Sequence, residues 1–134
     1  YLKYILMRVS FDFDSTLDRK LVQDYAKSLI NKGYEVWICT SRYDDDSIPV
    51  GFWKTKDVNL DLYKVTDSLG IPRERIKFMN MEEKHTFVKD MDFMFHLDDD
   101  WIEINWINRY TSTKGISCFG NTMWKAKCNK ILGI

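Results

Sequence analysis

Groups of acidic residues directly follow two of the apolar runs in this sequence. Asp12 and Asp14 lie at the end of the run 5–13, and the consecutive aspartates 98–100 follow the run 93–97. Carboxylates held close together repel, and one of them takes up a proton unless a cation intervenes. Such a cluster suits Mg²⁺, a hard cation that binds carboxylate oxygens and leaves positions for a substrate phosphate. Because a carboxylate can also attack phosphorus and form an aspartyl-phosphate, the acidic groups predict phosphoryl chemistry.

Hydroxyl and basic residues follow two further apolar runs. Thr40 and Arg42 come after the run 35–39, and Lys84 lies shortly after the run 76–79. A lysine beside the aspartates would offset part of their charge and attract a phosphate dianion. In open parallel sheets, ligands bind beyond the carboxyl ends of the strands. If these runs are parallel strands, all of these side chains converge on one crevice.

Apolar runs alternate with segments of helical periodicity along the chain. The sequence predicts strands over 5–13, 35–39, 76–79, 93–97 and 116–119. It predicts helices over 17–32, 60–69, 81–90, 101–109 and 122–132. Strands that alternate with helices imply a parallel sheet with right-handed crossovers. We therefore expect an α/β fold, a three-layer sandwich with a five-stranded parallel Rossmann-like core.

Capping residues mark several of the predicted helix ends. Gly33 and Gly70 suit the left-handed position that follows the last turn of a helix. Residues of the types that cap helix N-termini precede three of the predicted helices: Asn59, Asn80 and Asp100. Asn80 is followed three residues later by Glu83, which is the spacing of a capping box.

The composition indicates one globular domain. The 134 residues are 45% hydrophobic, and 20 Lys and Arg balance 20 Asp and Glu. A sequence-blind nucleic-acid binder usually carries a basic excess, because neutralising phosphates supplies its affinity. No apolar run reaches the length of a membrane span, and the three cysteines have no paired spacing. We expect a single domain over residues 1–134 in a reducing, cytoplasmic setting, with residues 1–6 either a tag remnant or an extension.

Four segments resemble, in order, the four motifs of the haloacid dehalogenase (HAD) superfamily of phosphohydrolases. Residues 11–17 (FDFDSTL) resemble the first motif, hydrophobic-Asp-x-Asp-x-Thr-hydrophobic. Residues 38–42 (ICTSR) resemble the second, in which Thr or Ser closes an apolar strand. Lys84 resembles the lysine of the third motif, and residues 97–99 (LDD) resemble the acidic pair of the fourth. Ser15 stands where the family often has Gly, and a third aspartate follows the acidic pair.

The resemblance implies a Mg²⁺-dependent phosphohydrolase that works through a covalent intermediate. Asp12 would be the nucleophile. Asp14 would protonate the leaving group and then activate water. Thr40 and Lys84 would bind the phosphoryl oxygens. Mg²⁺ would be held by the Asp12 carboxylate, the Asp14 backbone carbonyl and the acidic pair Asp98 and Asp99.

The resemblance also bears on the substrate. The segments between the motifs are too short for the cap domain that larger members of the family insert. The turn 40–42, together with the acidic pair, particularly resembles the phosphatase domain of phage-type polynucleotide kinases. It implies that Ser41 and Arg42 bind the substrate, a phosphorylated nucleotide or nucleic-acid end. Phe52 and Trp53, in the loop after this turn, could stack against a base.

Other functions share parts of this pattern. A phosphotransferase or mutase uses the same motifs but transfers the phosphoryl group to a different acceptor. A phosphatase of a small metabolite differs only in its substrate. A HAD-like domain without activity would bind a partner. A receiver domain is also phosphorylated on Asp but places it after the third strand, where residues 76–80 contain no carboxylate. Among single residues, Arg42 could pair with the acidic run 44–46, Asp100 could cap the helix after it, and His96 could be a hydrogen-bonded core histidine.

Overall fold

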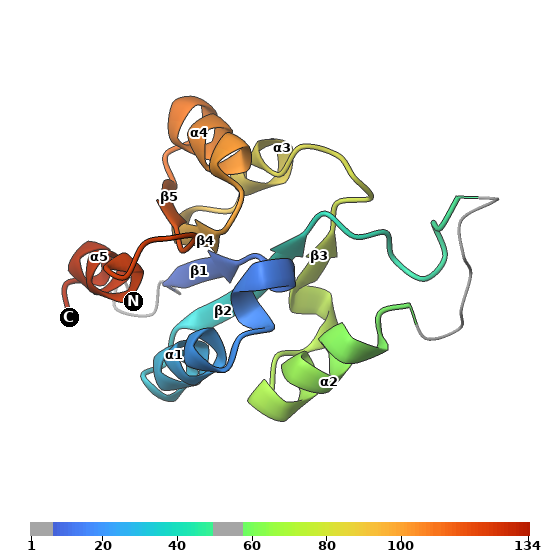
Figure 1. The fold of residues 1–134 in the computed structure, drawn as a ribbon, viewed down its shortest axis with the longest axis horizontal. Helices are drawn as coiled ribbons and strands as arrows, with labels where there is room; N and C mark the ends of the chain where they lie inside the picture. The colour runs from blue at the N-terminus through green and yellow to red at the C-terminus, as the bar shows by residue number, and fades with distance from the viewer. Residues whose placement is uncertain (1–6, 50–57) are drawn as a thin grey trace, which may run out of the picture.

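The centre of the fold is a sheet of five parallel strands in the order β3-β2-β1-β4-β5 (Figure 1). The structure is a computed structural model that describes residues 7–49 and 58–134. The strands are β1 (Arg8–Phe11), β2 (Glu35–Thr40), β3 (Ile76–Phe78), β4 (Phe93–Asp98) and β5 (Lys114–Ser117). The central strand β1 pairs with β2 on one side and β4 on the other. The predicted five-stranded parallel sheet is confirmed.

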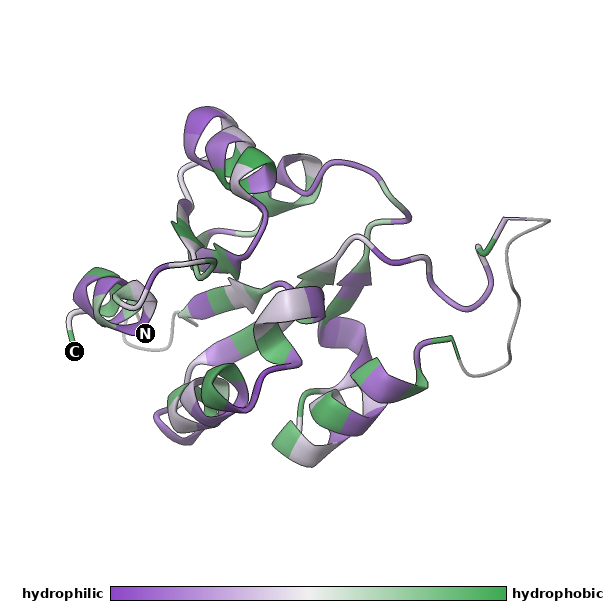
Figure 2. Ribbon diagram, in the orientation of Figure 1, coloured by the Kyte–Doolittle hydropathy of each residue, from purple (hydrophilic) through white to green (hydrophobic). Residues whose placement is uncertain are grey.

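Helices cover both faces of the sheet, so the fold is the predicted three-layer α/β sandwich (Figure 1). The helices are α1 (Lys20–Asn31), α2 (Leu60–Leu69), α3 (His85–Val88), α4 (Trp101–Tyr110) and α5 (Trp124–Leu132). Side chains of α1, α2 and α5 belong to the larger apolar core, and side chains of α3 and α4 belong to a second core cluster. The buried residues of α1 recur every three or four positions, which is the spacing of one helical face: Val22, Tyr25, Ala26 and Leu29. Figure 2 shows hydrophobic and hydrophilic residues interleaved along these helices accordingly.

The two faces of the central strands differ in polarity. Phe11 of β1 and Leu97 of β4 belong to the larger apolar core. Ser10, His96 and Asp98 alternate with them along the same strands, so they lie on the opposite face of the sheet. All three are fully buried. A line of buried polar side chains therefore leads along the α3–α4 face to the carboxyl ends of β1 and β4.

A tight turn, Phe13–Leu17, follows β1 and carries the first acidic motif. The backbone N–H of Asp12 donates to the carbonyl of Leu97 at 2.8 Å, which ties the start of the turn to β4. Ser15 has φ +61°, in the left-handed region that residues other than glycine seldom adopt. Because of this turn, α1 begins at Lys20, later than the sequence predicts.

Asn59 occupies the predicted N-cap position of α2, but the expected capping contact is wrong. Asn59 does precede α2, but its side chain makes no capping hydrogen bond. Its Nδ2 donates to the carbonyl of Tyr43 at 3.0 Å and to Oδ1 of Asp45 at 2.8 Å. Asn59 therefore fixes the loop after β2 against the start of α2.

The predicted capping box at Asn80 is also wrong. The backbones of Asn80 and Met81 are left-handed, with φ of +52° and +67°, so a helix cannot begin there. The Asn80 side chain accepts a hydrogen bond from the backbone N–H of Asp44 at 2.9 Å. The helix predicted over 81–90 is reduced to the single turn of α3, His85–Val88.

Other boundaries agree with the sequence or shift by a few residues. Gly33 and Gly70 have positive φ after α1 and α2, as predicted. Strand β5 begins at Lys114, before the predicted start at residue 116, because its pairing with β4 already includes Lys114 opposite Phe95. Within the described ranges, none of the helices has the length and apolar character needed to cross a membrane.

Candidate active site

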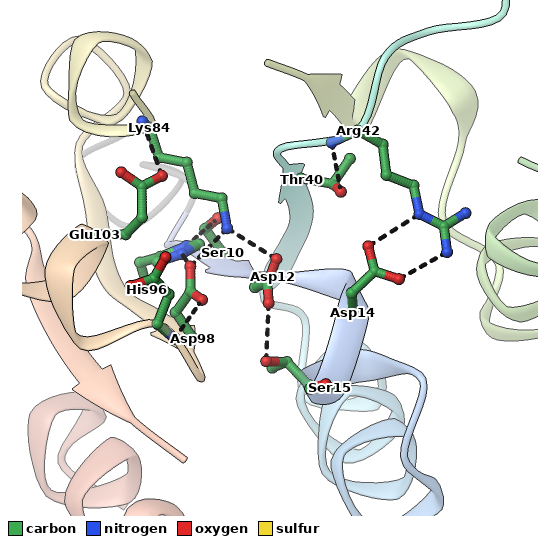
Figure 3. Close-up of polar contacts among 12 residues, drawn as sticks. Ser10, Asp12, Asp14, Ser15, Thr40, Arg42, Lys84, His96, Asp98 and Glu103 are labelled. Atoms are coloured by element: carbon green, nitrogen blue, oxygen red, sulfur yellow. Dashed lines mark hydrogen bonds and ion pairs between the residues drawn. The ribbon is translucent and has the colours of Figure 1, made fainter. Parts of the chain in front are cut away.

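The carboxyl edge of the sheet brings together the residues singled out from the sequence (Figure 3). Asp12 follows β1, Thr40 ends β2 and Asp98 ends β4. Lys84 reaches them from the segment that precedes α3. All four side chains are buried, with Lys84 only 2% exposed. The structure brings Asp12, Asp98 and Lys84 into contact, with Thr40 beside them at the same edge of the sheet.

Lys84 bridges two carboxylates. Its Nζ donates to Oδ1 of Asp12 at 2.8 Å and to Oδ2 of Asp98 at 2.7 Å. Burial alone would lower the pKa of Lys84, but the charges of Asp12 and Asp98 outweigh burial and raise the pKa above its ordinary value. Lys84 is therefore a permanently charged group inside the site. An ammonium has three donors, so one of them remains for a ligand.

The charge of Lys84 does not balance the carboxylates around it. Burial raises the pKa of Asp12 well above its ordinary value; Lys84 opposes this effect and the neighbouring charge of Asp98 adds to it. The pKa of Asp99 is also raised, by burial first and then by the charge of Asp98. Asp12 and Asp99 are thus crowded acidic groups that favour either a proton or a cation between them.

The same carboxylates form a candidate metal centre. One oxygen each from Asp12, Asp98 and Asp99 lies within 4.8 Å of the others. Oxygens bound to a single Mg²⁺ lie at most about 4.2 Å apart, since each bond is about 2.1 Å long. The three residues fit an oxygen-coordinated divalent cation after small side-chain adjustments. Asp100 stands apart, because its Oδ1 caps α4 by accepting the N–H of Ile102 at 2.9 Å, as one interpretation of the sequence predicts.

Asp14 lies outside this carboxylate cluster and pairs with Arg42. Arg42 donates through Nε and Nη2 to the two carboxylate oxygens of Asp14, at 3.0 and 2.7 Å (Figure 3). It also donates to both oxygens of Asp61 on α2, at 2.8 and 2.9 Å. The alternative pairing of Arg42 with residues 44–46 is wrong: its ion-pair partners within the described chain are Asp14 and Asp61.

The turn that follows β2 is held at both ends. Oγ1 of Thr40 accepts the backbone N–H of Arg42 at 3.2 Å, and the carbonyl of Thr40 accepts the N–H of Met79 at 2.7 Å. The carbonyl of Ser41 accepts the N–H of Met81 at 2.8 Å, and the Ser41 side chain lines a cavity of about 380 Å³. Substrate binding by Ser41 and Arg42 stays a prediction. Phe52 and Trp53 lie outside the described residues.

Sequence reasoning missed two groups that support the site. Nε2 of His96 bonds to Oδ2 of Asp98 at 2.7 Å, and Nδ1 of His96 bonds to Oγ of Ser10 at 2.9 Å. Oε2 of the buried Glu103 accepts the backbone N–H of Lys84 at 3.3 Å. His96 is a hydrogen-bonded core histidine, as one interpretation of the sequence held. Its link to Asp98 could have been found from their spacing of two residues in one strand, which places both on one face.

No protein-family model matches the chain, and no curated protein matches it.

Proposed function

We propose that this chain is a Mg²⁺-dependent phosphomonoester hydrolase of the HAD type, with Asp12 as its nucleophile. The observation that carries the proposal is the buried contact of Lys84 with both Asp12 and Asp98, beside Asp99. Buried charges cost several kcal/mol each in lost hydration, and well-packed apolar residues often serve stability as well or better. A buried lysine among three carboxylates is therefore better explained by chemistry than by stability.

The reaction follows from the positions of two aspartates. Mg²⁺ bound by Asp12, Asp98 and Asp99 would offset their charge and polarise a phosphoryl oxygen. An oxygen of Asp12 forms a bond to phosphorus while the bond from phosphorus to the leaving oxygen breaks, which gives an aspartyl-phosphate. Asp14 gives a proton to the leaving oxygen. It then accepts one from the water that attacks phosphorus and releases Asp12 and inorganic phosphate.

Two further side chains bind the phosphoryl group in this proposal. Lys84 directs its remaining donor to a phosphoryl oxygen, and its raised pKa keeps it charged throughout. The Thr40 hydroxyl is a second donor at the end of β2. Both groups are buried and held in place before substrate arrives, so little reorganisation is needed when negative charge builds up in the transition state.

The proposal requires Asp14 to exchange partners. In the free protein both carboxylate oxygens of Asp14 accept hydrogen bonds from Arg42. General acid catalysis needs the protonated form. We infer that an arriving phosphoryl group draws Arg42 away and leaves Asp14 to contact the leaving oxygen. Arg42 then acts as a substrate-binding residue, in line with its sequence prediction.

A nucleotide or a nucleic-acid terminal phosphate is the substrate class that we propose. A cavity of about 560 Å³ beside Asp99 is lined by Arg19 and Phe119, among others. Its volume is in the range of small-molecule sites, about 300–1,000 Å³. Phe119 is 77% exposed, so a base can stack on its ring, and the exposed Arg19 can bind a second phosphate. Stacking by Phe52 and Trp53, which lie outside the described residues, stays a separate prediction.

Turnover of an aryl phosphate tests the proposed function. We expect hydrolysis that requires Mg²⁺, stops with EDTA and is lost in Asp12→Asn, a change that keeps the shape of the side chain but removes the nucleophile. Full activity with excess EDTA would exclude the mechanism. A panel of nucleotides, 3′- and 5′-phosphorylated oligonucleotides and sugar phosphates then tests the substrate class. A preference for sugar phosphates would favour the alternative, a phosphatase of a small metabolite.

A further inference from the structure

A buried chain of hydrogen bonds runs behind the proposed metal centre. Ser10 on β1 bonds to Nδ1 of His96 on β4 at 2.9 Å, and Nε2 of His96 bonds to Oδ2 of Asp98 at 2.7 Å (Figure 3). All three side chains are completely buried. These hydrogen bonds begin between the central strands β1 and β4 and end at Asp98, a carboxylate of the candidate site.

The direction of each hydrogen bond follows from the groups involved. A carboxylate oxygen only accepts, so Nε2 of His96 carries the proton in its bond to Asp98. This holds whether or not Nδ1 is also protonated. The hydroxyl of Ser10 both donates and accepts, so it can satisfy Nδ1 in either form. Ser10 therefore fixes the orientation of the imidazole ring, and the ring fixes Asp98.

His96 limits the ways in which Asp98 can bind a ligand. Each carboxylate oxygen has about two lone-pair positions. His96 and Lys84 both donate to Oδ2 of Asp98, at 2.7 Å each, and so occupy both of its positions. Oδ1 accepts one bond, from the backbone N–H of Asp100 at 3.0 Å. One position on Oδ1 remains for a cation, and its direction is set by the contacts on Oδ2.

We propose that His96, held by Ser10, is a positioning residue that orients Asp98 toward the divalent cation of the site. This inference rests on the proposed function, since it assumes that the carboxylate cluster binds metal. Residues that hydrogen-bond to metal-binding groups orient those groups, and replacing them typically lowers metal affinity about 10- to 100-fold. Among the described residues, the acidic partner of His96 is Asp98 of the candidate metal centre.

Two substitutions of His96 by amide side chains distinguish positioning of Asp98 from a role in core packing alone. In His96→Gln the amide nitrogen can occupy the place of Nε2, so the donor to Asp98 is kept. In His96→Asn the amide reaches only the place of Nδ1, so the contact with Ser10 is kept and the contact with Asp98 is lost. Both variants replace a ring by a smaller polar group and disturb the core to a similar degree. They differ in the one bond that the proposal requires.

The closing experiment measures binding of Mn²⁺ alone by electron paramagnetic resonance, because Mn²⁺ shares the preference of Mg²⁺ for oxygen ligands. We expect the dissociation constant to rise about 10- to 100-fold in His96→Asn and to stay within about threefold of wild type in His96→Gln. The control is Thr113→Val, which removes another buried hydroxyl, bonded to the carbonyl of Phe93 at the opposite end of β4. It should lower the melting temperature without changing Mn²⁺ affinity.

The outcomes separate this inference from the proposed function. If the wild type binds no Mn²⁺, the proposed function fails. If the wild type binds and His96→Asn binds equally well, or if His96→Gln is as weak as His96→Asn, the positioning role is refuted. Should His96→Asn not fold, Ser10→Ala decides: it removes only the hydroxyl and should weaken Mn²⁺ binding by up to about fivefold. Unchanged affinity in Ser10→Ala would then overturn the inference.

Discussion

Removing the charge of Lys84 is the perturbation that the site geometry constrains most closely. In Lys84→Met the long side chain is kept, but Asp12 and Asp98 lose their shared cation. Breaking a buried ion pair by removing one partner costs about 3–5 kcal/mol, because a charge is left buried without compensation. The free energy of unfolding should fall by an amount in that range at pH 8, because Lys84 compensates two buried carboxylates.

The loss of stability in Lys84→Met should depend on pH. In the wild type the pKa of Asp12 is raised, by burial first, whereas the pKa of Asp98 is lowered, because His96 and Lys84 outweigh its burial. Their contributions to the pH dependence of stability therefore oppose each other. Lys84 lowers both pKa values, so its removal raises the pKa of Asp12 further and lets the pKa of Asp98 rise toward its ordinary value. The folded variant then binds more protons than the unfolded chain, so its stability falls as pH rises and recovers toward about pH 5.

Urea denaturation with EDTA present measures this effect. Tryptophan fluorescence reports unfolding, and the free energy of unfolding is compared at pH 5, 7 and 8. The control is Lys20→Met, because Lys20 forms an exposed pair with Asp24 and should contribute only a few tenths of a kcal/mol. If Lys84→Met is as stable as the control, or loses equal stability at all three pH values, the buried three-residue cluster does not exist as described.

Four further predictions concern the roles of single side chains. Asp99→Asn should weaken Mn²⁺ binding at least tenfold, whereas Asp100→Asn should leave it unchanged because asparagine also caps a helix; equal effects in calorimetric titrations would contradict this. Asp14→Asn should lower kcat for an alkyl phosphate more than for an aryl phosphate, because an aryl oxide needs less protonation as it leaves; equal losses would remove Asp14 as the acid. Arg42→Gln should raise KM for both substrates, and an unchanged KM would leave Arg42 as a structural partner of Asp14 and Asp61 only. Phe119→Ala should raise KM for a nucleotide but not for an aryl phosphate, and parallel changes would place the base elsewhere.

The fold and the centre of the site could be predicted from the sequence because both depend on regular patterns. Alternating apolar runs and helical segments determine a parallel sheet, and parallel strands place their carboxyl ends at one edge. Asp12 and Asp98 directly follow such strands, so their contact with Lys84 could be anticipated without coordinates.

The errors at Asn59, Asn80 and Arg42 involve side-chain contacts between distant segments. Asn59 and Asn80 have the sequence context of helix caps, but both bind the loop after β2 instead. Arg42 pairs with Asp61, which only the docking of α2 brings near. Capping rules describe neighbours along the chain, and they give way when a tertiary partner satisfies the same side chain.

His96 lies between these two cases. Its position two residues before Asp98 on one strand indicates a shared face, but the bond to Ser10 depends on the register between β1 and β4. Register depends on which face of each strand is buried against the rest of the core, so the sequence of one strand does not determine it alone.

The most direct test of the central claim is the mass of the protein during turnover. A reaction with a fast aryl phosphate and Mg²⁺ is quenched in acid within the first turnover, and the protein is analysed by mass spectrometry. The proposal predicts an added mass of about 80 Da, one phosphoryl group, on the peptide that contains Asp12. The adduct should be absent in Asp12→Asn and in samples with EDTA. Turnover without any adduct, together with undiminished activity of Asp12→Asn, would contradict nucleophilic attack by Asp12.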